Sequence, residues 1–472
     1  MTPEDLAFSP VAALARLIRE REISSVELLQ VYLDRIARFD DRLHAYVTVC
    51  GDAALDEARA ADAAVTKGDR LGPLHGVPIA AKDQFLTKGV RTTNGLRALA
   101  GFVPDVDATA VARLRGTGAI LLGKLNMPEA GLLGTRDWPF GQPRNPWNTE
   151  HDAGASSTGP GIAVAAGLCA AALGEDTGGS IRNPASYNGV VGVRPTWGRV
   201  SRYGIIPLNW SLDTAGPMTR TVADSALLMH VLAGHDPNDP FSARLPVPDY
   251  TAALDGRATG LRVGVIRELM DSTFLDPEVR DATTAAAAVF SRIGANVEEV
   301  SLPLFRIAGV IFAAIADSGA ALEHRHLRLS SPDSFDSGPR RRMLAASLLP
   351  NALSLRVEQA RVLIRDQIRS AFERFDVLLC PTAPAPAARL DAAPKLTWTR
   401  SDLLRFWERG SHTGPFSLAA VPAISIPNGF SRSGLPIGVQ LAARPFGETM
   451  LFRAAHAFES NLASPLRRPP LD

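Results

Sequence analysis

The stretch 154–196 constrains the fold of this chain more than any other part. It contains almost no charge and carries two serine-bearing turns, 154–159 and 176–180. The segment 162–168 between them is too small and too apolar for a surface position. Two Gly/Ser turns joined by a buried segment indicate that backbone N–H groups are arranged around a pocket.

The overall composition is that of a globular protein with a large core. The 472 residues are 46% hydrophobic and 21% charged. The 50 basic and 49 acidic residues leave a net charge of +1, which favours neither nucleic acid nor an anionic membrane. We therefore expect a small-molecule substrate, no nucleic-acid partner and no membrane association.

The cysteines and the N-terminus indicate a cytoplasmic protein. Cys50, Cys169 and Cys380 are far apart, odd in number and in apolar surroundings, which is typical of reduced core thiols. Charged residues interrupt the first twenty positions, so no secretory h-region is present. No charge-free apolar run is long enough to predict a membrane span.

Strand-like and helix-like segments interleave along the whole sequence. Strands are expected at 43–49, 261–266 and 297–300, and buried strands at 77–81, 119–123, 377–381, 423–427 and 437–441. Helices are expected at 53–66, 108–117, 222–233, 277–293, 307–327, 353–375 and 449–458, with another starting after the Ser24–Glu27 capping box. Arg340, Arg341 and Arg342 are assigned to a polar loop. This pattern predicts an α/β fold with a large sheet covered by helices on both faces.

Several catalytic motifs are absent from the sequence. It has no Gly-x-Ser-x-Gly elbow, no Ser-x-x-Lys, no Walker-type phosphate loop, no dinucleotide fingerprint and no His-Glu-x-x-His. His324 and His326 are neighbours in a charged helix, which favours a solvated face. We therefore expect no metal and no cofactor.

The remaining candidates are serines in glycine-rich turns and a lysine. The turn Gly178-Gly179-Ser180 places a hydroxyl where N–H groups converge, although such a turn alone is weak evidence of catalysis. A serine nucleophile needs a proton acceptor, and a neutral lysine can serve if burial lowers its pKa. Lys82 ends an apolar segment and has two interpretations, a buried base or a strand-end charge paired with Asp83.

Five segments of the sequence resemble the amidase signature family. They are residues 72–83, 145–147, 154–196, 198–204 and 213–224, in the family's order. The resemblance implies the amidase signature fold, a large mixed β-sheet between helices. It also implies one amidase domain over 1–472, made of N-terminal helices (1–70), a signature core (71–235), a divergent substrate-pocket region (300–415) and C-terminal strands with a helix (416–472).

The resemblance also implies the catalytic residues. Lys82, Ser156 and Ser180 fall on the family's triad, with Ser180 as the nucleophile and Ser156 relaying its proton to neutral Lys82. The peptide bond Ala155–Ser156 is expected to be cis. Backbone N–H groups of Thr177, Gly178, Gly179 and Ser180 are expected to form the oxyanion hole. Ser157, Asp176 and Arg182 are expected to support the site.

Three functions are compatible with this resemblance. The leading hypothesis is a free-standing amidase that hydrolyses a carboxamide to a carboxylic acid and ammonia or an amine. The first alternative is the A subunit of glutamyl-tRNA(Gln) amidotransferase, its glutaminase half. The second is a catalytically inactive binding protein on the same fold. We favour the free-standing enzyme because residues 300–415 carry no glutamine-binding motif that can be placed.

Substrate specificity is expected to come from the divergent region. Its segments 307–321, 349–355 and 398–407 are largely apolar, which favours an aryl or alkyl amide if they line the pocket. The first two are equally compatible with ordinary core helices. The oligomeric state is open, with a homodimer as one option.

Overall fold

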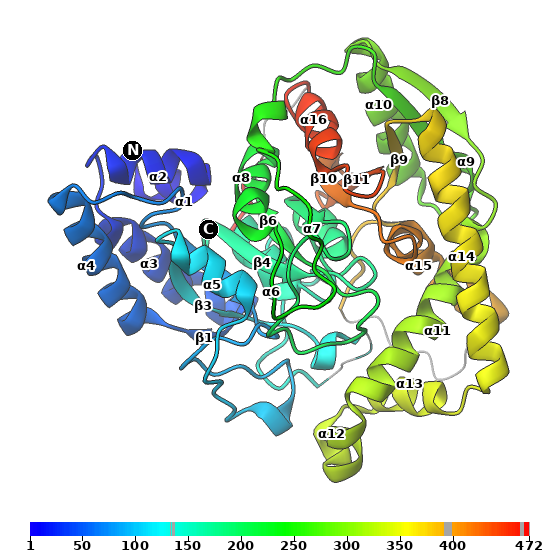
Figure 1. Ribbon diagram of the computed structural model, residues 1–472, viewed down its shortest axis with the longest axis horizontal. Coiled ribbons are helices and arrows are strands. Elements are labelled where there is room, and N and C mark those ends of the chain that lie inside the picture. Colours follow the sequence, from blue (N-terminus) through cyan, green and yellow to red (C-terminus); the bar gives the residue numbers. More distant parts are fainter. Residues whose placement is uncertain (133, 135–136, 391–398, 463–466, 472) are drawn as a thin grey trace.

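A single mixed sheet forms the centre of the molecule (Figure 1). The computed structural model describes residues 1–132, 134, 137–390, 399–462 and 467–471. Its eleven strands follow the order β1-β3-β2-β4-β6-β5-β10-β11-β9-β7-β8. The strands are β1 (Tyr46–Val49), β2 (Pro78–Lys82), β3 (Ile120–Leu125), β4 (Ala171–Glu175), β5 (Val191–Arg194), β6 (Ala215–Thr219), β7 (Arg262–Ile266), β8 (Asn296–Val300), β9 (Val377–Pro381), β10 (Ala423–Phe430) and β11 (Pro436–Ala443).

Sixteen α-helices surround this sheet in the described part of the chain. They are α1 (Pro3–Phe8), α2 (Val11–Arg19), α3 (Ser25–Leu43), α4 (Gly51–Lys67), α5 (Thr109–Gly116), α6 (Thr158–Ala165), α7 (Arg182–Asn188), α8 (Val222–Leu232), α9 (Arg267–Met270), α10 (Pro277–Arg292), α11 (Phe305–Glu323), α12 (Arg325–Ser330), α13 (Ser337–Ser347), α14 (Asn351–Arg374), α15 (Arg400–Leu418) and α16 (Glu448–Glu459). The predicted α/β class is confirmed.

Parallel and antiparallel pairings divide the sheet. β3, β2 and β4 are parallel neighbours, and so are β9, β7 and β8. Between these two sets, β6, β5, β10 and β11 pair antiparallel. Strands β2, β3 and β4 are buried at every residue, as expected for strands covered on both faces.

Three neighbouring strands, β2, β4 and β6, have their ends on the same side of the sheet, at an edge formed by strand ends, and these ends define where the site lies. Lys82 is the last residue of β2, and Glu175 is the last residue of its parallel neighbour β4. Glu175 is paired with Ala215, the first residue of the antiparallel strand β6. Asp213, two positions before β6, therefore reaches the same edge as Lys82 and Glu175.

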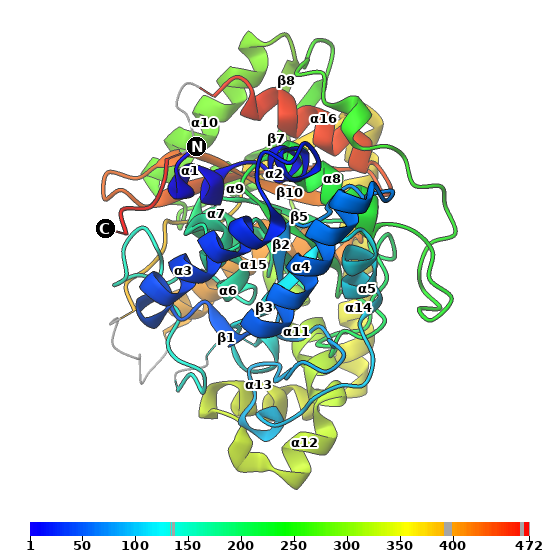
Figure 2. The same cartoon turned by 90° about the vertical axis from the view of Figure 1, so that its left-hand side faces the viewer.

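A second group of helices lies beyond this edge. Figure 1 shows α11, α13 and α14 on the side of the molecule away from the N-terminal helices α1–α4, which face the viewer in Figure 2. Helices α11 and α15 pack so closely that a Cβ on Gly309 would lie 2.0 Å from the Trp407 carbonyl oxygen. The apolar residues of this group form a hydrophobic cluster separate from the central core.

Three features of this region differ from the sequence interpretation. The predicted helix 307–327 breaks at His324 into α11 and α12. Arg340, Arg341 and Arg342 lie in α13, whose N-cap is Asp336, and not in a loop. The His324 side chain is only 3% exposed, because the break turns it inward against Phe335, so the solvated face expected for it is wrong.

Helix α11 is long and apolar enough to cross a membrane by length and composition. It contains Arg306 and Asp317, and it packs against α13, α14 and α15. Its inner face lines the pocket described below. These contacts are those of a helix packed within the protein.

Candidate active site

The two serine-bearing turns lie side by side at the sheet edge. The Ser157 N–H donates to the Ser180 carbonyl oxygen at 2.9 Å. The Ser157 hydroxyl is within hydrogen-bond distance of both the N–H and the carbonyl oxygen of Glu175, at 3.2 and 3.0 Å. Ser157 therefore holds the first turn against the end of β4. The peptide bond Ala155–Ser156 is cis, as the family resemblance implied.

Lys82 and Ser156 are in direct contact inside the protein. The Lys82 Nζ lies 2.8 Å from the Ser156 Oγ, and the two residues are 0% and 1% exposed. Burial lowers the pKa of Lys82 below its ordinary value, while a charge on the neighbouring Glu175 raises it and opposes that effect. Asp83 instead contacts Lys124 at 3.3 Å, so the strand-end pair Lys82–Asp83 considered from the sequence does not form.

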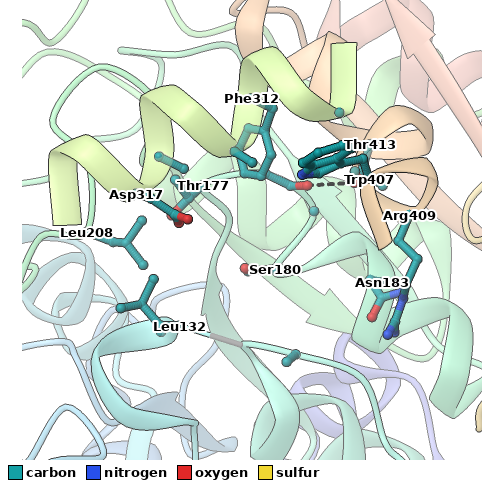
Figure 3. Close-up of a pocket in the computed structure, with 18 of the residues that line it drawn as sticks. Leu132, Thr177, Ser180, Asn183, Leu208, Phe312, Asp317, Trp407, Arg409 and Thr413 are labelled. Atoms are coloured by element: carbon teal, nitrogen blue, oxygen red, sulfur yellow. Dashed lines mark hydrogen bonds between the residues drawn. The ribbon is translucent and has the colours of Figure 1, made fainter. Parts of the chain in front are cut away.

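Ser180 is one of the residues that line a cavity of about 120 Å³ (Figure 3). A cavity of roughly 150 Å³ holds a benzene molecule, so this space suits a small acyl group. Thr177, Gly178 and Gly179 line it together with Ser180. The remaining walls come from 131–132, Ala155, Asn183, Leu208, helix α11, Arg342 and helix α15.

The backbone N–H groups of the second turn are not all available to a ligand. The Gly179 N–H donates to the Asp176 Oδ1 at 2.7 Å. Within the described residues, no hydrogen-bond acceptor is found for the N–H groups of Thr177, Gly178 and Ser180. Of the four oxyanion donors expected from the sequence, these three remain without an acceptor, and their role as an oxyanion hole stays a prediction.

Asp176 fixes the shape of this turn. Its carboxylate accepts hydrogen bonds from the backbone of Gly179 and Ile181 and from the guanidinium groups of Arg182 and Arg194, all of them buried. Burial alone would raise the pKa of Asp176, but the two arginines hold it well below its usual range. Arg182 also donates to the Gln440 Oε1 at 2.7 Å and so connects the turn to β11.

Two polar residues at the sheet edge were not identified from the sequence. The Glu175 Oε2 lies 3.1 Å from the Lys82 Nζ, and the Thr177 hydroxyl lies between Glu175 and Asp213. An acidic residue ending the apolar segment 171–174 was the available signal for Glu175. Asp213 carried no such signal, because only the pairing of β4 with β6 brings it to the site.

Part of the cavity is lined by residues of the segment 300–415, and the role of that segment in substrate binding stays a prediction. Phe312 and Asp317 from α11 and Trp407 from α15 line the cavity (Figure 3). The segment 349–355 instead borders a separate surface cavity through Leu349 and Ser354. Trp398 lies outside the described residues. Arg342 pairs with Asp317 at the pocket wall, with an Nη2–Oδ1 distance of 2.5 Å.

Among the residues that the structure describes, no cluster of three or more His, Cys, Asp or Glu side chains is arranged to hold a metal ion. The expectation of no metal and no cofactor stays a prediction. The buried cationic and anionic groups of the site are paired with one another or with backbone groups. A hydroxyl, a buried amine and backbone N–H donors are the groups that acyl transfer from an amide requires.

The fold and this site define an enzyme that acts on amide C–N bonds, by hydrolysis or by amide transfer. The chain belongs to the amidase family, whose model matches residues 27–452. Its fold is shared with the peptide amidase of Stenotrophomonas maltophilia, at a TM-score of 0.84 with 32% identity over 98% of this chain and 99% of that one. It is also shared with a 6-aminohexanoate cyclic dimer hydrolase, at a TM-score of 0.89 with 29% identity over 98% and 99% of the two chains.

Relatives that match this chain over its full length are named as amidotransferase subunits. The A subunit of glutamyl-tRNA(Gln) amidotransferase from Moorella thermoacetica is 43% identical over 99% of both chains. Its counterpart from Geotalea daltonii is 42% identical over 96% of this chain and 97% of its own. These relatives do not bear out the expectation that the chain resembles free-standing amidases more than the amidotransferase.

The expectation of no nucleic-acid partner is wrong. The relatives are subunits of an enzyme named for a glutamyl-tRNA, which places a nucleic acid and other subunits within the range of this family's partners. The sequence argument failed because it used the net charge of +1. Net charge averages over the whole surface, so it says nothing about a local basic patch or about contacts made through another subunit.

Proposed function

We propose that this chain cleaves an amide C–N bond through an acyl-enzyme on Ser180, with Ser156 and neutral Lys82 as the proton relay. The observation that carries the proposal is the buried 2.8 Å contact between the Lys82 Nζ and the Ser156 Oγ, one residue from Ala155, which lines the cavity with Ser180. A buried lysine without the usual charge is a competent base, and a serine between base and nucleophile can pass a proton in either direction.

The reaction follows from this arrangement. The Ser180 Oγ attacks the amide carbonyl while its proton passes to Ser156 and the Ser156 proton passes to Lys82. The carbonyl oxygen becomes an oxyanion that accepts hydrogen bonds from the N–H groups of Thr177, Gly178 and Ser180. The relay then runs backwards and protonates the leaving nitrogen, so that ammonia or an amine departs. Water, activated by the same relay, hydrolyses the acyl-enzyme.

The amide that the relatives favour is the side-chain amide of glutamine. Full-length similarity to the A subunit of glutamyl-tRNA(Gln) amidotransferase supports a role as the ammonia-releasing component of such an assembly. In that role the acceptor of the ammonia would be bound by a partner chain. The cavity of about 120 Å³ has room for a short acyl chain such as that of glutamine.

A free-standing amidase is the second candidate, and the apolar walls of the pocket favour it. Leu132, Leu208, Phe312 and Trp407 line the cavity together with Ser180 (Figure 3). The Arg342 guanidinium at the wall is paired with Asp317, so it is not an uncompensated charge that would demand an anionic substrate. This environment suits a neutral aryl or alkyl amide.

A substrate panel separates the two candidates. The purified chain would be assayed for ammonia release from L-glutamine, benzamide, hexanamide and a peptide amide, alone and with the other subunits of a bacterial glutamyl-tRNA(Gln) amidotransferase. Glutamine turnover that requires those subunits supports the amidotransferase role. Turnover of apolar amides by the chain alone supports the free-standing enzyme. No turnover of any amide under either condition would leave only an inactive binding protein.

A further inference from the structure

The Lys82 amine has three polar neighbours, and two of them belong to Glu175. Its Nζ lies 2.8 Å from the Ser156 Oγ, 3.1 Å from the Glu175 Oε2 and 3.3 Å from the Glu175 carbonyl oxygen. A neutral amine has two N–H groups and one lone pair. The three contacts are satisfied when both N–H groups point to Glu175 and the lone pair accepts the Ser156 hydroxyl proton. Lys82 can therefore be a base here without leaving a polar group unpaired.

A single hydroxyl connects Glu175 to a second carboxyl group. The Thr177 Oγ1 lies 2.9 Å from the Glu175 Oε1 and 2.8 Å from the Asp213 Oδ1. A hydroxyl has one proton and can donate to only one of two carboxylates. The other contact is a hydrogen bond only if that carboxyl group is protonated. The geometry therefore accounts for one proton shared between Glu175 and Asp213.

We propose that Glu175 and Asp213 share one proton through the Thr177 hydroxyl, and that its position sets the protonation state of Lys82. This inference rests on the proposed function of Lys82 as the base. Glu175 is neutral while Lys82 awaits the Ser156 proton, and it becomes a carboxylate when Lys82 becomes an ammonium. Glu175 and Thr177 thereby act as positioning residues for the charge of the relay.

The proton movements balance. Before attack, the Glu175 Oε1–H donates to the Thr177 hydroxyl, which donates to the ionised Asp213. When Ser180 attacks, its proton reaches Ser156 and the Ser156 proton reaches Lys82. The Glu175 proton moves to Thr177, and the Thr177 proton moves to Asp213. The new ammonium then faces a new carboxylate, and every shift reverses when the leaving nitrogen takes its proton.

The surroundings favour a pair that keeps one proton. Burial and the neighbouring Glu175 raise the pKa of Asp213 to about 8, so the two carboxyl groups keep one proton between them at neutral pH. The Asp213 Oδ2 accepts from the N–H groups of Leu208 and Asn209 at 2.8 and 2.9 Å, so Asp213 also has partners when ionised. The other charged groups near this network are Asp176 with Arg182 and Arg194 at the turn, and Arg202, Asp239 and Glu323 around the outer cavity that Asp213 lines.

The test measures the activation of Ser180 without needing the natural substrate. The probe is a fluorophosphonate, and its second-order rate of reaction with Ser180 is followed from pH 5 to pH 10 by mass spectrometry. In the wild type this rate falls on the acid side as Lys82 takes up a proton. Glu175→Gln removes the charge that raises the Lys82 pKa. We expect the acid limb to move to lower pH by about one to three units, with a lower plateau because the ammonium has no counter-charge.

Thr177→Val tests the shared proton separately. Without the hydroxyl, Glu175 loses the partner of its neutral form and stays ionised, which holds Lys82 as an ammonium. The acid limb is then expected to move to higher pH, opposite to Glu175→Gln. Thr177→Ser restores the hydroxyl and should restore the position of the limb. Glu298→Gln, an exposed glutamate paired with Arg374, is the matched control and leaves the profile unchanged.

The outcomes separate this inference from the proposed function. A wild type that is not labelled at Ser180 contradicts the function itself. Labelling at Ser180 with the same acid limb in the wild type and Glu175→Gln overturns only the shared-proton proposal. That comparison can overturn the shared-proton proposal even if Thr177→Val does not fold. Opposite shifts in the two variants support the proposal.

Discussion

The Asp176 carboxylate is the group whose loss should most damage the stability of the site. Its two oxygens accept from the guanidinium groups of Arg182 and Arg194 and from the Gly179 and Ile181 N–H groups, all without exposure to solvent. Asp176→Asn keeps the shape but leaves two buried guanidinium groups without a counter-charge. Removing one partner of a buried ion pair costs about 3–5 kcal/mol.

That free-energy cost can be converted into a decrease in the melting temperature. For a 472-residue chain, an unfolding entropy of about 2.1 cal/mol/K per residue amounts to roughly 1 kcal/mol/K. Asp176→Asn should therefore lower the Tm by about 3–5 °C at pH 7 in differential scanning calorimetry. Because the folded pKa of Asp176 lies below its ordinary value of 3.8, its contribution to stability is present above about pH 4 and is lost as the pH falls further. The difference between wild type and variant should shrink accordingly in acid.

The matched control is Asp56→Asn, an exposed carboxylate paired with Arg59. Exposed ion pairs contribute about 0–1 kcal/mol, so its Tm should stay within about 1 °C of the wild type. If Asp176→Asn also changes the Tm by less than about 1 °C, the argument that this carboxylate stabilises the turn is refuted.

Three further variants test the site and the fold. Lys82→Ala should reduce kcat/KM for any amide substrate by about 100- to 10,000-fold without changing the circular dichroism spectrum, and near-wild-type turnover would refute Lys82 as the base. Gly179→Ala forces a φ of +123° on a residue with a side chain and places its Cβ 2.3 Å from the Thr413 Oγ1. Initial rates should therefore fall about 100-fold. An unchanged rate would show that the turn need not keep this shape. Burial lowers the pKa of His324 to about 4, so protonation of this residue should cost about 3 kcal/mol of stability as the pH falls from 6.5 to 4. His324→Leu should lose that part of the pH dependence of stability in urea unfolding curves. The same pH dependence in both proteins would contradict the burial of a neutral His324.

The sequence is sufficient to predict the local parts of this molecule. The helix that starts after Ser24 has its capping box, with the Glu27 N–H on the Ser24 Oγ at 3.0 Å. Eight of the eleven strands were predicted, most of them from continuously apolar segments typical of strands covered on both faces, whereas β4, β5 and β6 were missed. Lys82 was singled out as a lysine at the end of such a strand, which is where the structure places it.

The parts that the sequence did not predict depend on contacts between distant segments. Asp213 reaches Glu175 because β4 pairs antiparallel with β6, a register that no local pattern encodes. His324 was assigned to a solvated face because its neighbours are charged, and only the break between α11 and α12 turns it inward. Arg342 was assigned to a loop although it lies in α13, because three consecutive arginines conceal the helix periodicity.

The function was predicted to the level of reaction class and not beyond it. The proposed catalytic residues Ser156 and Ser180 lie in the signature turns and Lys82 ends β2, whereas the pocket walls come partly from α11, α13 and α15. The preference for a free-standing enzyme rested on the lack of a recognisable glutamine motif in 300–415. Relatives named as amidotransferase subunits match the chain over that region too, at 43% identity over the whole length.

The central claim is that Ser180 carries the acyl group during turnover. The most direct measurement is acid quenching of the chain during turnover of an activated ester or amide, followed by peptide mapping with mass spectrometry. The account predicts an acyl adduct on the peptide that contains Ser180, and no adduct in Ser180→Ala. An adduct on another residue, or full turnover by Ser180→Ala, would contradict it.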